Sequence, residues 1–387
     1  MAFSGPSDAA KRRPGGPQLF REEKHAAIFP RAPESCQCEN LGVPCAAFDS
    51  DGLPVANQPR TIKVLRFFIA VKITHRFSIA LCLLALALPA GHALHAAKAF
   101  AIVDSQTGYV IEQQGMKDKR QVGSLTKVAA AMVVLDWSEK KSGDLNQMAT
   151  IPPEAFLGTG ENLIGFQPGD RITLRDLLYA ALVQSDNIAA YTLAYHVGHE
   201  LQSIVPTAPS ANASPVGTFV GQMNALAKTL RMDRTRFVNP HGIDTSERSL
   251  PYSTAADLAR LTRYAVNKAG FRFYVSQKER QITFDRGGKK IGYMLRNTNE
   301  LLGRDGVDGV KTGRTARAGD CLILSAQRES QIVKEGPRTA VIPRHLVIVI
   351  LGSTDRFGEG AQLLARGWQL YDQWAAGGRM VDPHKTL

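Results

Sequence analysis

Hydrophobic residues recur along this chain with two different spacings, and the spacing distinguishes predicted strands from predicted helices. Short apolar or alternating stretches bounded by turn residues predict strands. The strands that we predict are Ala99–Val103, Tyr109–Gln113, Gln281–Phe284, Ile291–Leu295, Gly309–Thr315, Cys321–Gln327 and His345–Leu351. Longer stretches with a period of about 3.6 residues predict helices. These run from Ser124 to Trp137, from Leu174 to Gln184, from Asn187 to His199, from Phe219 to Met232, from Ser253 or Thr254 to Ala269, and from Gly360 to Trp374.

The order of these elements predicts the fold class. Strands lie near both ends of the periodic region and helices gather between them, which favours an α+β fold with one antiparallel sheet flanked by helices. Gly287 and Gly288 predict the turn of a hairpin, and Thr173 has capping-box spacing to Asp176 at the start of a helix. A stretch rich in Pro, Ala and Ser at 205–216 predicts a loop.

The first 97 residues are organised differently. Residues 1–59 are rich in Pro, Gly and charge without periodicity, which predicts poor order. In residues 60–97, basic side chains precede the apolar run Ile79–Leu88 and small residues follow it, which is typical of a secretory signal; an uncleaved N-terminal anchor is the alternative. Because a signal peptide stands at the start of a chain, we expect either an unusually long leader or a translation start after Met1, for example at Val64 or Val71.

This organisation predicts an exported protein of the periplasm or cell envelope. Its body would cover residues 98–376 and its tail residues 377–387. We expect any membrane association to come from the N-terminal segment, because no amphipathic membrane helix follows the body.

Composition narrows the classes of function. Of the 387 residues, 44% are apolar, enough to bury a large core. The net charge is +12, but the basic residues form no Arg-rich run and do not alternate with aromatic residues, so we expect no nucleic-acid partner. Cys36, Cys38 and Cys45 lack a convincing fourth ligand, and Cys321 is predicted to be a small buried hydrophobe. We therefore expect neither a metal nor a cofactor.

The first candidate for chemistry is Ser124, with Lys127 three residues later on the same face of the helix. A lysine held in apolar surroundings can lose its charge and take the proton of a serine hydroxyl. Unpaired N–H groups at a helix start can also stabilise an oxyanion. The spacing alone is a weak signal, since Ser138 and Lys141 repeat it at the tail of the same helix. An N-cap serine with a solvated lysine is the structural alternative.

Two further polar clusters occupy places where apolar structure does not need them. One is Ser185, Asp186 and Asn187 between two predicted helices, and the other is the Lys311–Gly313 cluster on a predicted strand. The combination of Ser-x-x-Lys, Ser-x-Asn and Lys-Thr-Gly is characteristic of penicillin-binding proteins and class A β-lactamases. With the flanking stretches Gln167–Asp170, Phe237–Asp244 and Gly309–Ala326, residues 98–374 resemble the serine D-alanyl-D-alanine carboxypeptidases, the low-molecular-mass penicillin-binding proteins of peptidase family S11.

The resemblance implies a fold and a reaction. The fold would be the penicillin-binding, β-lactamase-like domain, an antiparallel sheet flanked by helices with an all-helical subdomain. The reaction would remove the terminal D-alanine from peptidoglycan stem pentapeptides, with penicillins and other β-lactam antibiotics as covalent inhibitors. The implied roles are nucleophile for Ser124, base for Lys127, proton relay for Ser185, amide binding for Asn187, positive potential for Lys311 and carboxylate binding for Thr312. The N–H groups of Ser124 and of Arg314, the residue after Gly313, would form the oxyanion hole, and Gly313 belongs to the substrate-binding cluster.

Three alternatives stay open at this point. A D,D-endopeptidase acting on peptidoglycan cross-links uses the same residues. A class A-like β-lactamase needs a carboxylate that activates the deacylating water, and no convincing Glu-x-x-x-Asn lies between Ser185 and Lys311. A non-catalytic peptidoglycan-binding protein would keep the fold alone.

Arg314 and Arg317 replace the aromatic or acidic residues expected after Lys-Thr-Gly, which leaves the substrate preference undecided. The stretch Asn239–Gly242 is interpreted as a turn.

Overall fold

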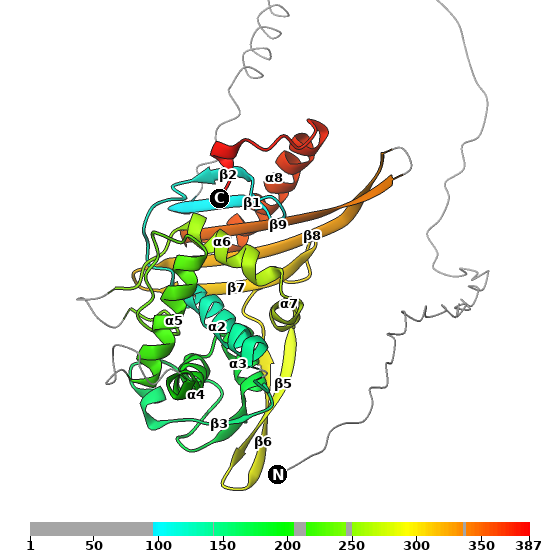
Figure 1. Cartoon of the computed structure of the whole chain (residues 1–387). Helices are drawn as coiled ribbons and strands as arrows, with labels where there is room; N and C mark the ends of the chain where they lie inside the picture. Colours follow the sequence, from blue (N-terminus) through cyan, green and yellow to red (C-terminus); the bar gives the residue numbers. More distant parts are fainter. Residues whose placement is uncertain (1–95, 142, 205–213, 245–249, 336–337) are drawn as a thin grey trace, which may run out of the picture. The chain divides into compact units, whose positions relative to one another are not determined.

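Five strands form the central antiparallel sheet of this protein, in the order β2-β1-β9-β8-β7 (Figure 1). The computed structural model describes residues 96–387 except 142, 205–213, 245–249 and 336–337. The strands of this sheet are β1 (Ala99–Asp104), β2 (Val110–Gln114), β7 (Val307–Thr315), β8 (Gly319–Glu335) and β9 (Arg338–Ser353). The α+β fold and the antiparallel sheet are therefore as predicted.

A second antiparallel sheet of four strands lies apart from the first, in the order β3-β4-β5-β6. Its strands are β3 (Met148–Thr150), β4 (Arg171–Thr173), β5 (Glu279–Arg286) and β6 (Lys289–Arg296). The predicted hairpin is β5 and β6, whose turn residues Gly287 and Gly288 have φ of 57° and 85°. The expectation of a single sheet was wrong, because β3 and β4 have three residues each and are too short to display a period.

Alternation along the central strands buries both faces of the large sheet. On β1, Ala101 and Val103 belong to one hydrophobic core, whereas Phe100 and Ile102 belong to the other. The second core is covered by α8 (Arg356–Ala376), which contributes Leu363, Leu364, Trp368 and Tyr371. The first core is covered by the remaining helices.

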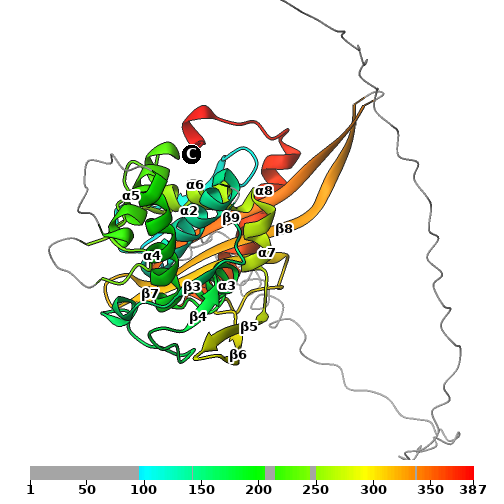
Figure 2. The same ribbon diagram turned by 60° about the horizontal axis from the view of Figure 1, so that its bottom comes forward.

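Helix α2 (Thr126–Lys141) runs through the middle of the first core (Figure 2). It contacts α3 (Leu174–Leu182), α4 (Asn187–Ile204), α5 (Pro215–Thr229), α6 (Ala255–Val266) and α7 (Ala269–Val275). Every residue from 128 to 135 is buried, which explains why this stretch is apolar on all sides. Short 3-10 turns are η1 (Gly123–Leu125), η2 (Pro153–Phe156) and η3 (Pro383–Lys385).

Helix boundaries follow local capping chemistry. The Thr173 hydroxyl accepts from the Asp176 N–H at 3.0 Å, as the capping-box spacing predicted. Thr254 caps α6 in the same way, but the predicted helix to Ala269 is divided, since α6 ends at Val266 and α7 begins at Ala269. Helix α5 starts earlier than predicted, with Ser214 as its cap.

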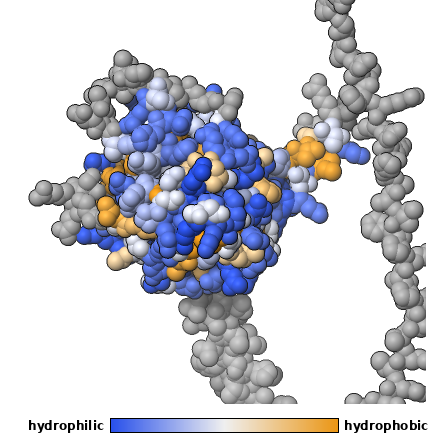
Figure 3. Space-filling model, turned by 90° about the horizontal axis from the view of Figure 1, so that it is seen from below, coloured by the Kyte–Doolittle hydropathy of each residue, from blue (hydrophilic) through white to orange (hydrophobic). Residues whose placement is uncertain are grey.

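Strands β8 and β9 continue well past the predicted Gln327 and His345. The neighbouring strands β7 and β1 stop pairing near Ala326 and Leu346, so the remainder is a two-stranded ribbon (Figure 2). Its side chains include Ile332 and Val341, with exposed fractions of 67% and 64%. Figure 3 shows apolar surface on this projecting arm.

Several predictions from the sequence fall outside the described residues. These are the leader at 1–59, the signal or anchor up to residue 95, the cysteines before Lys98, and most of the loop at 205–216. Within the described part of the chain, no helix has the length and apolar character needed to cross a membrane. Cys321 is buried and forms no disulfide.

We expect Gly198→Ala to destabilise the fold. Gly198 lies inside α4, where a Cβ atom would come within 2.0 Å of the Pro215 carbonyl oxygen. Overpacking of this kind typically costs about 1–3 kcal/mol, which exceeds the roughly 1 kcal/mol that alanine contributes through helix propensity. Gly221→Ala in α5 is the matched control, because nothing lies within 4 Å of the added atom. Urea unfolding should show a loss for the first variant and a gain for the second; equal effects would contradict this account.

Candidate active site

Ser124 lies in η1, immediately before α2, and is half-buried. Strand β7 passes very close to it: a Cβ atom at Gly313 would lie 2.8 Å from the Val122 carbonyl oxygen and 3.1 Å from the Ser124 nitrogen. Only glycine permits this approach of the strand to the serine. The close contact brings the first and third sequence clusters together.

Lys127 is fully buried, and its amine faces three oxygen atoms. Nζ lies 2.9 Å from Ser124 Oγ, 2.6 Å from Asn187 Oδ1 and 3.0 Å from the His241 carbonyl oxygen. Burial lowers the pKa of Lys127 to about 7, although the nearby Asp186 carboxylate acts to raise it. A substantial fraction of this lysine is therefore neutral near neutral pH, in contact with the serine hydroxyl.

The Ser185–Asn187 cluster forms the junction between α3 and α4. Ser185 has φ of 68°, a left-handed conformation that costs a non-glycine residue on the order of 1–3 kcal/mol. Asp186 caps α4 by accepting from the Ala189 N–H at 2.7 Å, and burial raises its pKa to about 6. Asn187 joins two parts of the site, because its Nδ2 donates to the Thr159 carbonyl at 2.7 Å while its Oδ1 accepts from Lys127.

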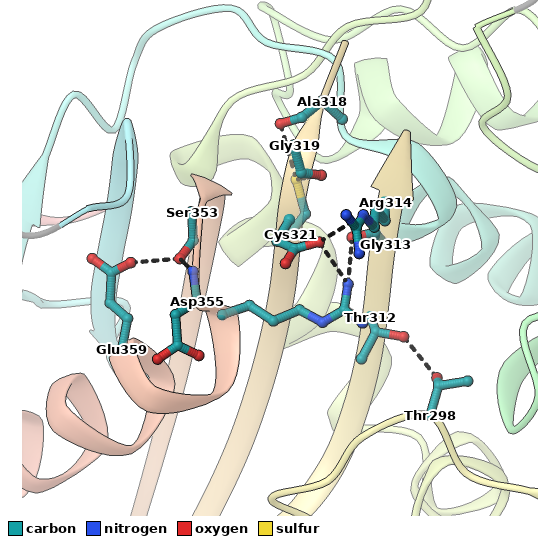
Figure 4. Close-up of polar contacts among 12 residues, drawn as sticks. Thr298, Thr312, Gly313, Arg314, Ala318, Gly319, Cys321, Ser353, Asp355 and Glu359 are labelled. Atoms are coloured by element: carbon teal, nitrogen blue, oxygen red, sulfur yellow. Dashed lines mark hydrogen bonds and ion pairs between the residues drawn. The ribbon is translucent and has the colours of Figure 1, made fainter. Parts of the chain in front are cut away.

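The third cluster, on β7, is buried, and the basic side chains of Lys127 and Arg356 lie near its Lys311. Burial is the main cause that lowers the pKa of Lys311 well below its ordinary value, and Lys127 and Arg356 lower it further. Arg356 donates to the Gly313 carbonyl at 3.2 Å. Thr312 and Thr298 point toward each other with their hydroxyl oxygens 2.6 Å apart (Figure 4).

A backbone N–H of the β7 wall also lies beside the serine. A Cβ atom at Gly123 would be 3.2 Å from the Arg314 nitrogen, which places that peptide N–H next to the residue preceding Ser124. The backbone nitrogens of Ser124 and Arg314 thus belong to two closely packed segments, η1 and β7. Such a pair of donors is suited to a developing oxyanion.

The structure brings all eight predicted site residues to this region, and it adds groups that the sequence analysis did not identify. The turn at Asn239–Gly242, interpreted as structural only, supplies the His241 carbonyl that binds Lys127. Gly242 has φ of 88°, and a Cβ atom there would be 1.9 Å from the Gly123 carbonyl oxygen. No side-chain pattern reveals a backbone carbonyl, and Arg356 stands too far along the chain from Lys311 for a spacing rule.

Next to these groups lies a cavity of about 420 Å³. Its walls come from the loop at 159–163, from Gln184–Asn187, from Ile243, and from Arg314 and Thr315. In the described part of the chain, no group of three or more His, Cys, Asp or Glu side chains is placed to hold a metal ion.

Comparison with known proteins identifies relatives of this arrangement. The peptidase S11 family, described as D-alanyl-D-alanine carboxypeptidase, matches residues 88–334. The chain is 29% identical over 284 residues to the D-alanyl-D-alanine carboxypeptidase DacC of Escherichia coli, covering 71% of this chain and 62% of that protein. It is 32% identical over 229 residues to a D-alanyl-D-alanine endopeptidase of the same organism, covering 58% and 64%. The chain therefore spans about three fifths of the length of these relatives.

Solved structures have the same fold. The crystal structure of the Streptomyces K15 DD-transpeptidase matches with a TM-score of 0.59 and 27% identity, covering 71% of this chain and 98% of that one. Penicillin-binding protein D2 from Listeria monocytogenes in its ampicillin-bound form matches with a TM-score of 0.55 and 25% identity, covering 72% and 99%. The predicted penicillin-binding fold is confirmed by these similarities.

Proposed function

Because this chain belongs to the peptidase S11 family of serine-type D-alanyl-D-alanine carboxypeptidases, we propose that it removes the terminal D-alanine from peptidoglycan stem pentapeptides through an acyl-enzyme. The observation that carries this proposal is the distance of 2.9 Å between Lys127 Nζ and Ser124 Oγ, in a setting that lowers the lysine pKa to about 7. A nucleophile and a base near its operating pH are then in contact.

In the acylation step, Ser124 Oγ attacks the carbonyl carbon of the penultimate D-alanine and its proton passes to Lys127 Nζ. The carbonyl oxygen becomes an oxyanion and accepts from the N–H groups of Ser124 and Arg314, and each such donor is typically worth about 10² to 10³ in rate. As the C–N bond breaks, Ser185 relays the proton to the nitrogen of the leaving D-alanine. Water then hydrolyses the ester and restores the serine.

The basic side chains of Lys127, Lys311 and Arg356 support cleavage next to the free carboxylate at the end of a substrate peptide. Lys127 and Lys311 are buried with lowered pKa values, and Arg356 lies beside them. Asp186 acts on Lys127 and Asp320 pairs with Arg356 at 3.2 Å, and an incoming carboxylate would further stabilise the charged forms of the two lysines. Thr312 Oγ1 and the neighbouring basic side chains would thus bind the terminal carboxylate of the substrate, which favours removal of its last residue.

The identity of the leaving group separates the proposal from its alternative. An endopeptidase would use the same serine and lysine on a cross-linked peptide, and a relative with that name is 32% identical to this chain. Peptidoglycan places the substrate in the cell envelope, where we expect the protein to act. Attachment through the N-terminal segment stays a prediction.

The test is incubation with a stem pentapeptide and, separately, with a cross-linked muropeptide dimer. We expect D-alanine release from the pentapeptide and a lasting covalent adduct with a fluorescent penicillin, because the same acyl bond forms. Dimer cleavage without D-alanine release would favour the endopeptidase. Rapid penicillin turnover would favour a β-lactamase, and folded protein without release or labelling would favour a binding role.

A further inference from the structure

The turn in front of Asp244 is held by the side chain of Asn239. Asn239 Oδ1 accepts from the N–H groups of His241 and Gly242, at 3.3 Å and 2.6 Å. Asn239 Nδ2 donates to the Ile243 carbonyl at 2.9 Å. Three hydrogen bonds from one amide thus fix the backbone that leads into Asp244.

The same turn is fixed to the segment that carries the nucleophile. The His241 carbonyl accepts from the Lys127 amine at 3.0 Å. A Cβ atom at Gly242 would lie 1.9 Å from the Gly123 carbonyl oxygen, so the two backbones are in direct contact. The turn therefore keeps one position relative to Ser124 and Lys127, and other parts of the site can be held against it.

Asp244 connects this turn to the end of β7. Its Oδ2 accepts from the Thr315 hydroxyl at 2.5 Å, a contact between residues 71 positions apart in the chain. Thr315 Oγ1 also accepts from the Ala318 N–H at 3.0 Å, inside the turn that joins β7 to β8. Because a hydrogen bond to a carboxylate is stronger than one between neutral groups, this contact can hold the end of the strand.

The carboxylate of Asp244 is placed at a cost to the fold. Its Oδ1 is buried and has no hydrogen-bond partner in the part of the chain that the structure describes. A buried carboxylate oxygen without a partner lowers stability. Groups that a fold retains at such a cost are typical of functional sites, which points to a role for Asp244 beyond stability.

The Arg314 N–H is the group that this contact can position. Arg314 directly precedes Thr315, and β7 is the last strand of the large sheet, so pairing with β8 fixes it along one edge only. A Cβ atom at Gly123 would lie 3.2 Å from the Arg314 nitrogen. The Asp244–Thr315 bond therefore ties the peptide next to Arg314 to the turn that contacts Gly123.

We propose that Asp244 is a positioning residue of the acylation step, which acts through the Thr315 hydroxyl to hold the Arg314 N–H where the oxyanion forms. The inference rests on the proposed function, because the position of this N–H matters to the rate only if an oxyanion forms beside Ser124. Displacement of a catalytic group by about 1 Å can cost on the order of 10²-fold in rate.

The test is kcat and KM for D-alanine release from the pentapeptide, measured on the full chain. Thr315→Val removes the hydroxyl and Asp244→Ala removes its acceptor. Each should lower kcat roughly 10- to 100-fold with KM unchanged, because an oxyanion donor acts in the transition state and complete loss of one typically costs about 10² to 10³. The double variant should lose no more than either single variant, because all three lack the same contact.

Conservative variants should restore the rate. Thr315→Ser keeps the hydroxyl and Asp244→Asn keeps an oxygen that accepts from it, so both should retain most of kcat. In all of these variants kcat/KM should still fall below about pH 7, as the Lys127 pKa predicts, since Asn239 still holds the turn that provides the His241 carbonyl. General damage to the fold would not be confined to kcat in this way.

Thr107 offers a matched control, because its hydroxyl makes the same two kinds of hydrogen bond outside the site. It donates to Asp104 Oδ2 at 2.7 Å and accepts from the Tyr109 N–H at 3.1 Å, in the turn between β1 and β2. Thr107→Val should lower the free energy of unfolding in urea, as Thr315→Val does, and leave kcat and KM unchanged.

The outcomes separate this role from the function on which it rests. Unchanged kcat in Asp244→Ala or Thr315→Val, a raised KM alone, or additive losses in the double variant would overturn the positioning role and leave the carboxypeptidase intact. If Asp244→Ala does not fold, Thr315→Val and Thr315→Ser decide the role by the same measurements.

The proposed function is wrong if the folded, unaltered protein releases no D-alanine. The rate of labelling by a fluorescent penicillin, whose carbonyl oxygen also becomes an oxyanion, then decides the role of Asp244 by the same comparison of variants. Absence of both release and labelling would overturn the function and the positioning role together.

Discussion

Ser124→Ala is expected to abolish both D-alanine release and covalent labelling by penicillin. Ser124 Oγ is the atom that forms the acyl bond, and among the residues that the structure describes it is the hydroxyl bound to the Lys127 amine, whose two other partners are an amide oxygen and a backbone carbonyl. Loss of a nucleophile in a serine hydrolase costs up to about 10⁶ in kcat, with the remaining rate coming from binding and the oxyanion donors. We therefore expect a decrease of at least ~10⁴-fold, measured as D-alanine released per enzyme.

The chain contains a matched control for this experiment. Ser138 has the same spacing to Lys141 as Ser124 has to Lys127, but it lies near the end of α2, where its hydroxyl donates to the Gly143 carbonyl. Ser138→Ala should retain labelling and release. The assignment of the nucleophile would be wrong if Ser124→Ala kept either activity, or if both variants lost them equally while remaining folded by circular dichroism.

The fold could be predicted from the sequence where side chains face a core. Alternation on β1 and the all-round apolar character of α2 both reflect burial, and both elements lie where the pattern placed them. The β8–β9 ribbon was predicted too short because it leaves the sheet and loses the core that imposes alternation. Ile332 and Val341 pair across the strands and are exposed. Backbone hydrogen bonds between two exposed strands do not require alternating apolar side chains, so the sequence of this ribbon shows no such alternation.

The candidate site divides in a similar way. The three motifs could be located because each has polar side chains at fixed spacing, and the structure places them in one region. The His241 carbonyl could not be predicted, since the property that matters is the backbone position of a turn held by Asn239 Oδ1, which accepts from the Gly242 N–H at 2.6 Å. Arg356 reaches the site from the start of α8, a contact created by tertiary packing.

Electrostatics of the site also differ from the simplest expectation. The family resemblance implied a positive potential from Lys311, yet burial and two neighbouring cations lower the pKa of Lys311 itself. Lys127 has three oxygen acceptors, whereas Lys311 Nζ donates to the Thr312 carbonyl at 2.9 Å. As a cation, the Lys127 amine therefore has more hydrogen-bond acceptors than the Lys311 amine. A bound carboxylate would raise both pKa values, so the charge on Lys311 becomes favourable when substrate is present.

Lys127→Met is expected to lower kcat/KM for D-alanine release by about 10² to 10⁴, the usual contribution of a general base. For the unaltered protein, the plot of kcat/KM against pH should fall on the acidic side of about pH 7. The Lys127 amine accepts a proton from Ser124 only when it is neutral, and burial lowers its pKa to about 7. We call this fall the acidic limb. Below that pH the neutral fraction, and with it kcat/KM, should fall about tenfold per unit. The variant should lack this limb.

A competing source of the limb is Asp186, whose pKa burial raises to about 6. If Asp186 caused it, the limb would persist in Lys127→Met and disappear in Asp186→Asn.

Unfolding gives a second, independent measurement of the Lys127 pKa. An unfolded lysine keeps its proton up to about pH 10.5, whereas the folded one releases it near 7, so the unfolded state binds more protons between these values. The free energy of unfolding of the unaltered protein should therefore contain a component that rises with pH across this interval, and Lys127→Met should lose that component. If Lys127→Met removes both the acidic limb of kcat/KM and the rise in the free energy of unfolding with pH, then Lys127 is a base that burial keeps neutral.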